Sequence, residues 1–196
     1  MARYKKRHVR VLSGRLKGKV LSYPDDRRLR PTMQRVKASV FESLGNLIAG
    51  TVFIDLYAAS GGIGIEAISR GANFVHFVEN DGRALECLAE NLERCGIGSD
   101  RRVVHTMDVM GFLREGGLIE AGASVVYADP PYTTKDIPLL LEFFDGIDYA
   151  GETLLVLEHP KDAVSMESYD RLARKKIKKF GQSWVSLIVS ARGERP

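Results

Sequence analysis

Four consecutive residues, Asp129-Pro130-Pro131-Tyr132, combine groups that could perform chemistry on a planar amine. The two prolines fix φ and remove two backbone N–H donors, which leaves the Asp carboxylate and a rigid carbonyl as acceptors. If both hydrogens of an exocyclic amine are accepted, its nitrogen can rehybridise and direct its lone pair at a methyl carbon. The carboxylate would stabilise the positive charge that develops, and Tyr132 could stack on a base. The structural alternative is a polar turn after a strand.

A loop of small residues over 58–64 lies between a buried apolar run and a helical pattern. Small residues let the backbone approach a ligand closely, and a helix N-terminus presents free N–H groups. A dinucleotide-binding fold uses the same device for a pyrophosphate, and a tight turn without a ligand has the same composition. The loop alone therefore leaves its ligand open.

Three acidic residues at the ends of successive predicted strands narrow the choice of ligand. Glu79 follows Asp55 by 24 residues, where a carboxylate can accept hydrogen bonds from ribose hydroxyls. Asp108 follows the next strand, where it could accept from an adenine amino group. Asp55 at the entrance of the loop would repel a diphosphate but suit an ammonium and a sulfonium. The sign of charge therefore favours S-adenosylmethionine over a nicotinamide dinucleotide.

Strand and helix patterns alternate from residue 51 onward. This predicts an α/β fold with a doubly wound, mostly parallel seven-stranded sheet, Rossmann-like, in which ligands bind beyond the carboxyl ends of the strands. Two final runs with no helix between them, 176–180 and 184–190, predict a C-terminal antiparallel hairpin. The expected strands cover 52–57, 74–79, 103–106, 123–128 and 153–158, and the expected helices cover 63–70, 83–95, a short segment ending near 113, and 138–144.

The N-terminal segment differs in charge from the rest of the chain. Residues 1–37 carry 13 Lys or Arg and 2 Asp or Glu, a balance of +11, so residues 38–196 sum to −7 within a total of +4. We interpret 1–37 as a basic arm for contact with a polyanion and 38–196 as the catalytic domain; a solvated tail is the alternative. Short runs at 9–12 and 19–21 predict a hairpin, and the spacing over 32–47 predicts a helix with Thr32 as a possible N-cap.

Composition excludes several classes of protein. No stretch approaches the roughly 18 to 20 apolar residues of a transmembrane helix. Cys87 and Cys95 have no His or Cys companions at ligand spacing, which argues against a disulfide scaffold and a zinc site. We expect a cytoplasmic monomer without metal, and we assign no catalytic role to His76, His105 or His159.

Several motifs together resemble the RsmD-type family of class I S-adenosylmethionine-dependent methyltransferases, which methylate N2 of a guanine in 16S ribosomal RNA. The similarity runs from about Val11 to Glu158. The motifs that carry it are Gly14-Arg15-Leu16-Lys17-Gly18, Arg30-Pro31-Thr32 with Arg35-Val36-Lys37 and Phe41, Asp55-Leu56-Tyr57-Ala58-Ala59-Ser60-Gly61, Gly64, Glu66-Ala67, Ser69-Arg70-Gly71-Ala72 and Asp129-Pro130-Pro131-Tyr132.

The resemblance implies roles for individual residues and 16S ribosomal RNA, within a small-subunit particle, as the partner. Asp129, Pro130, Pro131 and Tyr132 would hold the target amine. The cofactor would be lined by Asp55, Tyr57, Ala59, Ser60, Gly61, Gly64, Glu79, Asn80, Asp108 and Val109. The charge of the basic arm and the resemblance together predict the residues that bind RNA: Arg3, Lys5, Lys6, Arg7, Arg15, Lys17, Arg30, Thr32 and Arg35.

Two departures from the family pattern lie in these motifs. The family usually has Gly where Ala59 stands, and a positive φ there would cost alanine roughly 1 kcal/mol. It often has Phe where Tyr57 and Tyr132 stand, and a tyrosine keeps the stacking face.

Other functions remain open at this stage. An adenine-N6 methyltransferase of DNA or RNA uses the same catalytic loop. A protein-glutamine N5 methyltransferase faces the same electronic problem, although such enzymes typically begin the loop with Asn rather than Asp129. A non-enzymatic RNA-binding protein on an inactive methyltransferase fold is the third reading.

Overall fold

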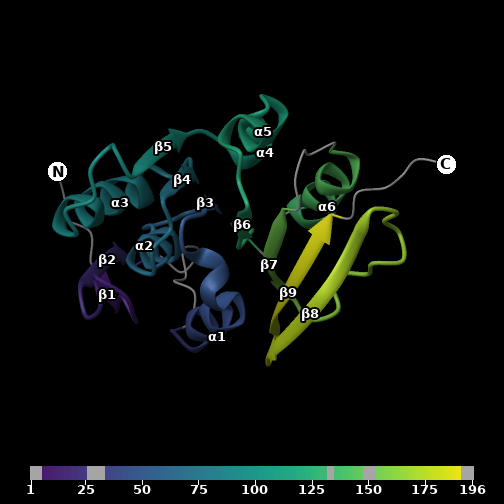
Figure 1. Ribbon diagram of the computed structural model, residues 1–196, viewed down its shortest axis with the longest axis horizontal. Coiled ribbons are helices and arrows are strands. Elements are labelled where there is room, and N and C mark those ends of the chain that lie inside the picture. The colour runs from purple at the N-terminus through teal and green to yellow at the C-terminus, as the bar shows by residue number, and fades with distance from the viewer. Residues whose placement is uncertain (1–5, 26–33, 132–134, 148–152, 191–196) are drawn as a thin grey trace.

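A computed structural model describes residues 6–25, 34–131, 135–147 and 153–190 (Figure 1). Over these residues the chain forms one large sheet and a separate two-stranded hairpin. The strands of the large sheet, in the order in which they lie side by side, are β5 (Arg102–Thr106), β4 (Phe74–Glu79), β3 (Val52–Leu56), β6 (Val125–Ala128), β7 (Leu154–Pro160), β9 (Ser183–Ser190) and β8 (Leu172–Phe180).

The first five strands in this order run parallel, and β9 is antiparallel to both of its neighbours. The doubly wound, mostly parallel seven-stranded sheet with a C-terminal antiparallel hairpin is therefore confirmed. Because β9 is antiparallel to both β7 and β8, strand β8 runs in the same direction as β7 and β6.

Helices cover both faces of the sheet, so its central strands are buried and largely apolar. One apolar cluster joins α1 (Gln34–Leu44), α2 (Gly62–Ser69) and α3 (Gly82–Arg94) to one face, on which Phe53 lies. The other cluster joins α4 (Val109–Arg114), α5 (Gly117–Ala121) and α6 (Asp136–Gly146) to the face that carries Ile54 and Leu56. Within the described residues, no helix is long and apolar enough to cross a membrane.

The element boundaries depart from the predicted ones in a few places. Helix α5 was not predicted, and α1 ends at Leu44 before a 3-10 turn over Gly45–Ile48. Strand β8 begins four residues earlier than predicted, because a register shift between Arg174 and Lys176 interrupts the alternation by which strands are recognised. The predicted N-cap, Thr32, lies outside the described residues.

The N-terminal segment forms the predicted hairpin, β1 (Lys6–Arg10) paired with β2 (Val20–Pro24), and packs against α2 and α3. The carboxylate of Glu66 in α2 is fully buried and accepts hydrogen bonds from the backbone N–H groups of Leu12 (2.7 Å) and Ser13 (3.0 Å). It also lies 3.3 Å from the buried ammonium of Lys37. Side chains of the hairpin thus share one apolar cluster with α1, α2 and α3.

Candidate functional site

Four acidic residues lie at or just beyond the carboxyl ends of four adjacent strands, at one edge of the sheet. From β5 to β6 they are Asp108, Glu79, Asp55 and Asp129. Asp55 pairs with Tyr127 and Leu56 with Ala128, so the predicted catalytic motif begins one strand away from the small-residue loop. The chain proceeds from β3 outward to β4 and β5 and then returns to β6 on the other side. The acids therefore surround the point where strand order reverses, which is the ligand position typical of such sheets.

The loop between β3 and α2 has an unusual backbone. Positive φ angles occur at Tyr57 (58°), Ala59 (46°) and Gly61 (79°). The expectation that a positive φ would strain Ala59 is therefore met in the structure. A Cβ at Gly64 would lie 2.2 Å from the ring of Phe77, so only glycine lets α2 pack this closely on β4.

Asp55 is buried beneath the loop and supports the start of α2. Its Oδ2 accepts a hydrogen bond from the backbone N–H of Gly64 at 2.8 Å. Burial raises the pKa of Asp55 to about 8, with a smaller contribution from the charge of Glu79 and an opposing one from the Gly64 hydrogen bond. A cationic group bound near Asp55 would favour its ionised form.

Glu79 joins the loop to the end of β4. Its Oε2 accepts from the backbone N–H of Ala59 at 2.7 Å, and its Oε1 accepts from those of Asn80 and Asp81 at 2.8 Å each. A carboxylate has about four acceptor positions, so one remains for a ribose hydroxyl. Asp108 is exposed and caps α4 by accepting from the N–H of Gly111 at 2.8 Å.

Helix α6, which comes after the predicted catalytic motif in the chain, is joined to the segment between β3 and α2 by a side-chain hydrogen bond. Asp129 is half-buried, Pro130 is buried and Pro131 is exposed, while Tyr132 lies outside the described residues. The hydroxyl of Tyr57 donates to Oδ2 of Asp136, the first residue of α6, at 2.8 Å. Burial and the nearby Asp136 raise the pKa of Tyr57, which keeps it a donor. Sequence patterns carried no signal for this contact, because its partners lie 79 positions apart.

Asn91 is a further residue that the sequence analysis missed. It is fully buried on α3, and its side-chain amide donates to the carbonyls of Ser22 (2.7 Å) and Ser60 (2.9 Å) while accepting from the N–H of Ser22 (2.8 Å). It thereby connects strand β2 of the N-terminal hairpin to the small-residue loop. An amide on the same helical face as Leu88 and Leu92 was the available signal.

The residues predicted to bind RNA have varied surroundings. Lys6 pairs with Glu90 at 2.6 Å, and Arg7 pairs with Asp25. Exposed positions are occupied by Arg15, Lys17 and Arg35. Four others lie outside the described residues: Arg3, Lys5, Arg30 and Thr32.

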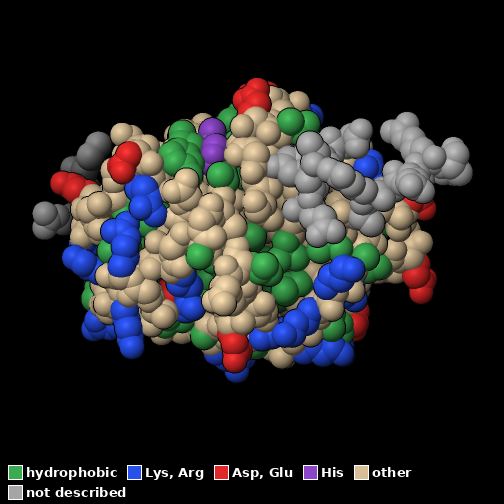
Figure 2. Space-filling model, viewed as in Figure 1, with side chains coloured by type: hydrophobic (Ala, Val, Ile, Leu, Met, Phe, Trp, Pro, Cys, Tyr) green, Lys and Arg blue, Asp and Glu red, His purple; other side chains and the backbone are tan. Residues whose placement is uncertain are grey.

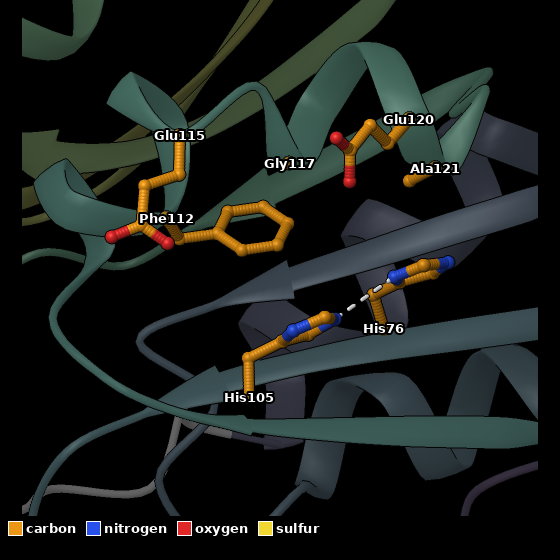
Figure 3. Close-up of a pocket in the computed structure, with 7 residues that line it drawn as sticks. All are labelled: His76, His105, Phe112, Glu115, Gly117, Glu120 and Ala121. Carbon is orange, nitrogen blue, oxygen red and sulfur yellow. Dashed lines mark hydrogen bonds between the residues drawn. The ribbon is translucent and has the colours of Figure 1, made fainter.

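A pocket of about 300 Å³ lies between the sheet and helices α4 and α5 (Figure 3). Nδ1 of His76 lies 3.1 Å from Nε2 of His105, and burial lowers the pKa of His76 to about 4, so this imidazole is neutral at pH 7. No group of three or more His, Cys, Asp or Glu among the described residues could hold a metal ion. None of the predicted site residues lines this pocket, which is formed by His76, His105, Phe112, Glu115, Gly117, Glu120 and Ala121.

The family model described as "Conserved hypothetical protein 95" matches residues 9–189. The chain belongs to this family. A relative from Bacillus subtilis, "Putative rRNA methyltransferase YlbH", is 31% identical over 180 residues, which are 91% of this chain and 97% of that protein. "Ribosomal RNA small subunit methyltransferase D" of Escherichia coli is 34% identical over 124 residues, which are 63% of this chain and 60% of that protein. The resemblance to the RsmD-type family is thereby confirmed.

Two solved structures of other proteins share the fold of this chain. The "Putative methyltransferase yhhF" from Escherichia coli superposes with a TM-score of 0.81 at 23% identity, covering 95% of this chain and all (100%) of that one. An RNA methyltransferase from Salinibacter ruber, in complex with S-adenosyl-L-homocysteine, gives a TM-score of 0.60 at 19% identity and covers 85% of this chain and 97% of that one.

Proposed function

We propose that this protein transfers a methyl group from S-adenosylmethionine to the exocyclic N2 amine of a guanine in 16S ribosomal RNA. The substrate would be a small-subunit particle in the cytoplasm, and the protein would act as a monomer. The observation that carries the proposal is the adjacency of two loops. The small-residue loop after β3 and the Asp129-Pro130-Pro131 motif after β6 begin on neighbouring strands at one edge of the sheet.

The residues around the loop fit this cofactor chemically. Buried Asp55 suits a cationic ligand, and Glu79 keeps an acceptor position at the end of β4 for a ribose. Exposed Asp108 offers an acceptor for an adenine amine, next to Val109 at the start of α4. When bound, S-adenosylmethionine supplies an electrophilic methyl group on a sulfonium.

Asp129 would act on the target amine by accepting one of its hydrogens, while a backbone carbonyl of the proline pair accepts the other. Both contacts turn the nitrogen lone pair out of conjugation with the ring. During methyl transfer the Asp129 carboxylate would stabilise the positive charge that develops on this nitrogen, and it would take up the proton that the amine must lose. The rigid prolines keep these acceptors in place, so much of the acceleration would come from orientation.

The names of relatives support RNA as the substrate class. Both the Bacillus subtilis and the Escherichia coli relatives are named as ribosomal RNA methyltransferases. The resemblance to the RsmD-type family supports guanine N2 over adenine N6 as the acceptor. The intact Asp129 favours a nucleobase over a glutamine amide.

The test is methyl transfer from labelled S-adenosylmethionine to small-subunit particles that lack the modification, followed by nucleoside analysis. Protein-free 16S RNA serves as the parallel substrate. We expect N2-methylguanosine, formed faster in the particles. N6-methyladenosine would refute the proposed acceptor while keeping the reaction type, and absence of label from RNA would refute the proposed substrate class.

A further inference from the structure

The C-terminal part of the chain contains a second basic segment, although the net charge of residues 38–196 as a whole is negative. Residues 38–170 carry 8 basic and 22 acidic side chains, whereas residues 171–196 carry 8 basic and 1 acidic. Five of these basic side chains lie within six positions of strand β8: Arg174, Lys175, Lys176, Lys178 and Lys179. Figure 2 shows Lys and Arg side chains in a row along the course of β8.

The basic strand leads to the same edge of the sheet as the catalytic motif. The register joins Ala128 to Leu157, Leu157 to Ser186 and Ser186 to Ile177 across neighbouring strands. Lys178, one residue later, is therefore level with Asp129. Three strand spacings separate β6 from β8, a distance of roughly 15 Å at about 4.8 Å per spacing.

Two of these lysines are fixed in place at that edge. Nζ of Lys178 donates to the carbonyl of Ser39 (3.0 Å) and to its hydroxyl (2.7 Å), which attaches β8 to helix α1. Nζ of Lys179 lies 4.4 Å from the ring centroid of Trp184. Lysines 175, 176 and 179 are exposed, and no acidic side chain within the described residues forms an ion pair with them.

Lysines on an edge strand can also serve to prevent pairing with another molecule. One or two charges, or the register shift at Arg174 alone, would be enough for that purpose. In β8, basic side chains lie on both faces of the strand, and they extend along it to the end that is level with the catalytic edge. The β1–β2 hairpin lies at the opposite end of the molecule (Figure 1), so two basic surfaces flank the catalytic edge.

We propose that strand β8 is a second RNA-binding surface, which contacts the phosphate backbone of the substrate on the β8 side of the target base. This inference rests on the proposed function, because it takes the polyanion to be the RNA that is methylated. Lys176 and Lys179 would bind phosphates directly, and Lys178 would hold the strand against α1.

The test compares the double variant Lys176→Gln/Lys179→Gln with a matched control, Arg83→Gln/Arg114→Gln, which removes two exposed charges on α3 and α4. Binding to 16S ribosomal RNA is measured at several salt concentrations. Loss of two phosphate contacts should weaken binding about tenfold at low salt and lower the slope of log affinity against log salt by roughly 1.5. The control should bind as the unchanged protein does.

A second readout uses the single tryptophan of the chain, Trp184. Because Lys179 lies over its ring, RNA bound at β8 should change the tryptophan emission of the unchanged protein. Two results together would overturn the inference in a protein that still methylates RNA. They are a tryptophan emission of the unchanged protein that RNA does not alter, and a salt slope of the Lys176→Gln/Lys179→Gln variant that equals that of the unchanged protein. If the unchanged protein transfers no methyl group to RNA, the proposed function itself fails, and the two results are thus distinguishable.

Discussion

Ala59 stands where a positive φ of 46° disfavours any residue with a Cβ. Ala59→Gly should therefore stabilise the small-residue loop by up to about 1 kcal/mol, less the extra entropy that glycine gives the unfolded chain. Because the backbone N–H of Ala59 that bonds to Glu79 remains in place, we expect cofactor binding no weaker than that of the unchanged protein. Calorimetric titration with S-adenosylmethionine checks this, with Ala121→Gly as a control on α5. Weaker binding in Ala59→Gly would contradict the strain argument.

Asp55 makes stability depend on pH. Burial raises its pKa in the folded protein to about 8 from 3.8, so the folded state holds a proton that the unfolded state releases between these values. The resulting stabilisation is complete below about pH 4 and is lost as pH rises toward 8. Asp55→Asn should remove this decline in unfolding free energy, which approaches about 1.4 kcal/mol per pH unit for one proton. The same substitution should weaken cofactor binding.

The pH effect is measured by urea unfolding of both proteins at pH 5, 6, 7 and 8. The exposed Asp108→Asn variant is the control. Parallel stability curves for Asp55→Asn and the unchanged protein would show that Asp55 does not titrate in this window.

At the level of helices and strands, α3 connects the N-terminal hairpin to the small-residue loop through Asn91. Asn91→Ala would leave the N–H and carbonyl of Ser22 and the carbonyl of Ser60 without this partner. A buried donor or acceptor that loses its hydrogen-bond partner costs about 1 to 3 kcal/mol. We therefore expect the unfolding free energy to fall by roughly 3 kcal/mol, and we expect weaker cofactor binding. Asn46→Ala, at an exposed site, is the control. An unaltered cofactor affinity would mean that Asn91 supports the hairpin alone.

The position of the four acids at one edge could be predicted because each acid lies at or near the end of a predicted strand, and parallel strands end at a common edge. The contact of Tyr57 with Asp136 and the bridge at Asn91 could not, since both depend on how distant elements pack. The start of β8 was misplaced because its register shift at Arg174 removes the period-two pattern. Local patterns thus predicted the candidate site, while the contacts that hold its residues in place needed the structure.

At the scale of the molecule, the two basic surfaces, on the β1–β2 hairpin and on strand β8, lie at opposite ends (Figure 1). If one RNA spans both surfaces, the losses of binding free energy should be additive. One loss comes from neutralising Arg15 and Lys17 in the hairpin, and the other from neutralising Lys176 and Lys179 in β8. The fourfold variant should then lower the salt slope by about 3, twice the effect of either pair. Filter binding to 16S ribosomal RNA measures this. A fourfold variant no weaker than either pair would indicate that RNA does not use both surfaces together.

The most direct test of the central claim, that Asp129 acts on the amine beside a separate cofactor loop, compares Asp129→Asn with the unchanged protein. Cofactor affinity is measured by calorimetry, and methyl transfer to small-subunit particles in a single turnover. We expect affinity within about threefold and a transfer rate lower by roughly 10² to 10³, the cost of losing one charge-stabilising group. Equal losses in affinity and rate, or full transfer by Asp129→Asn, would contradict the account.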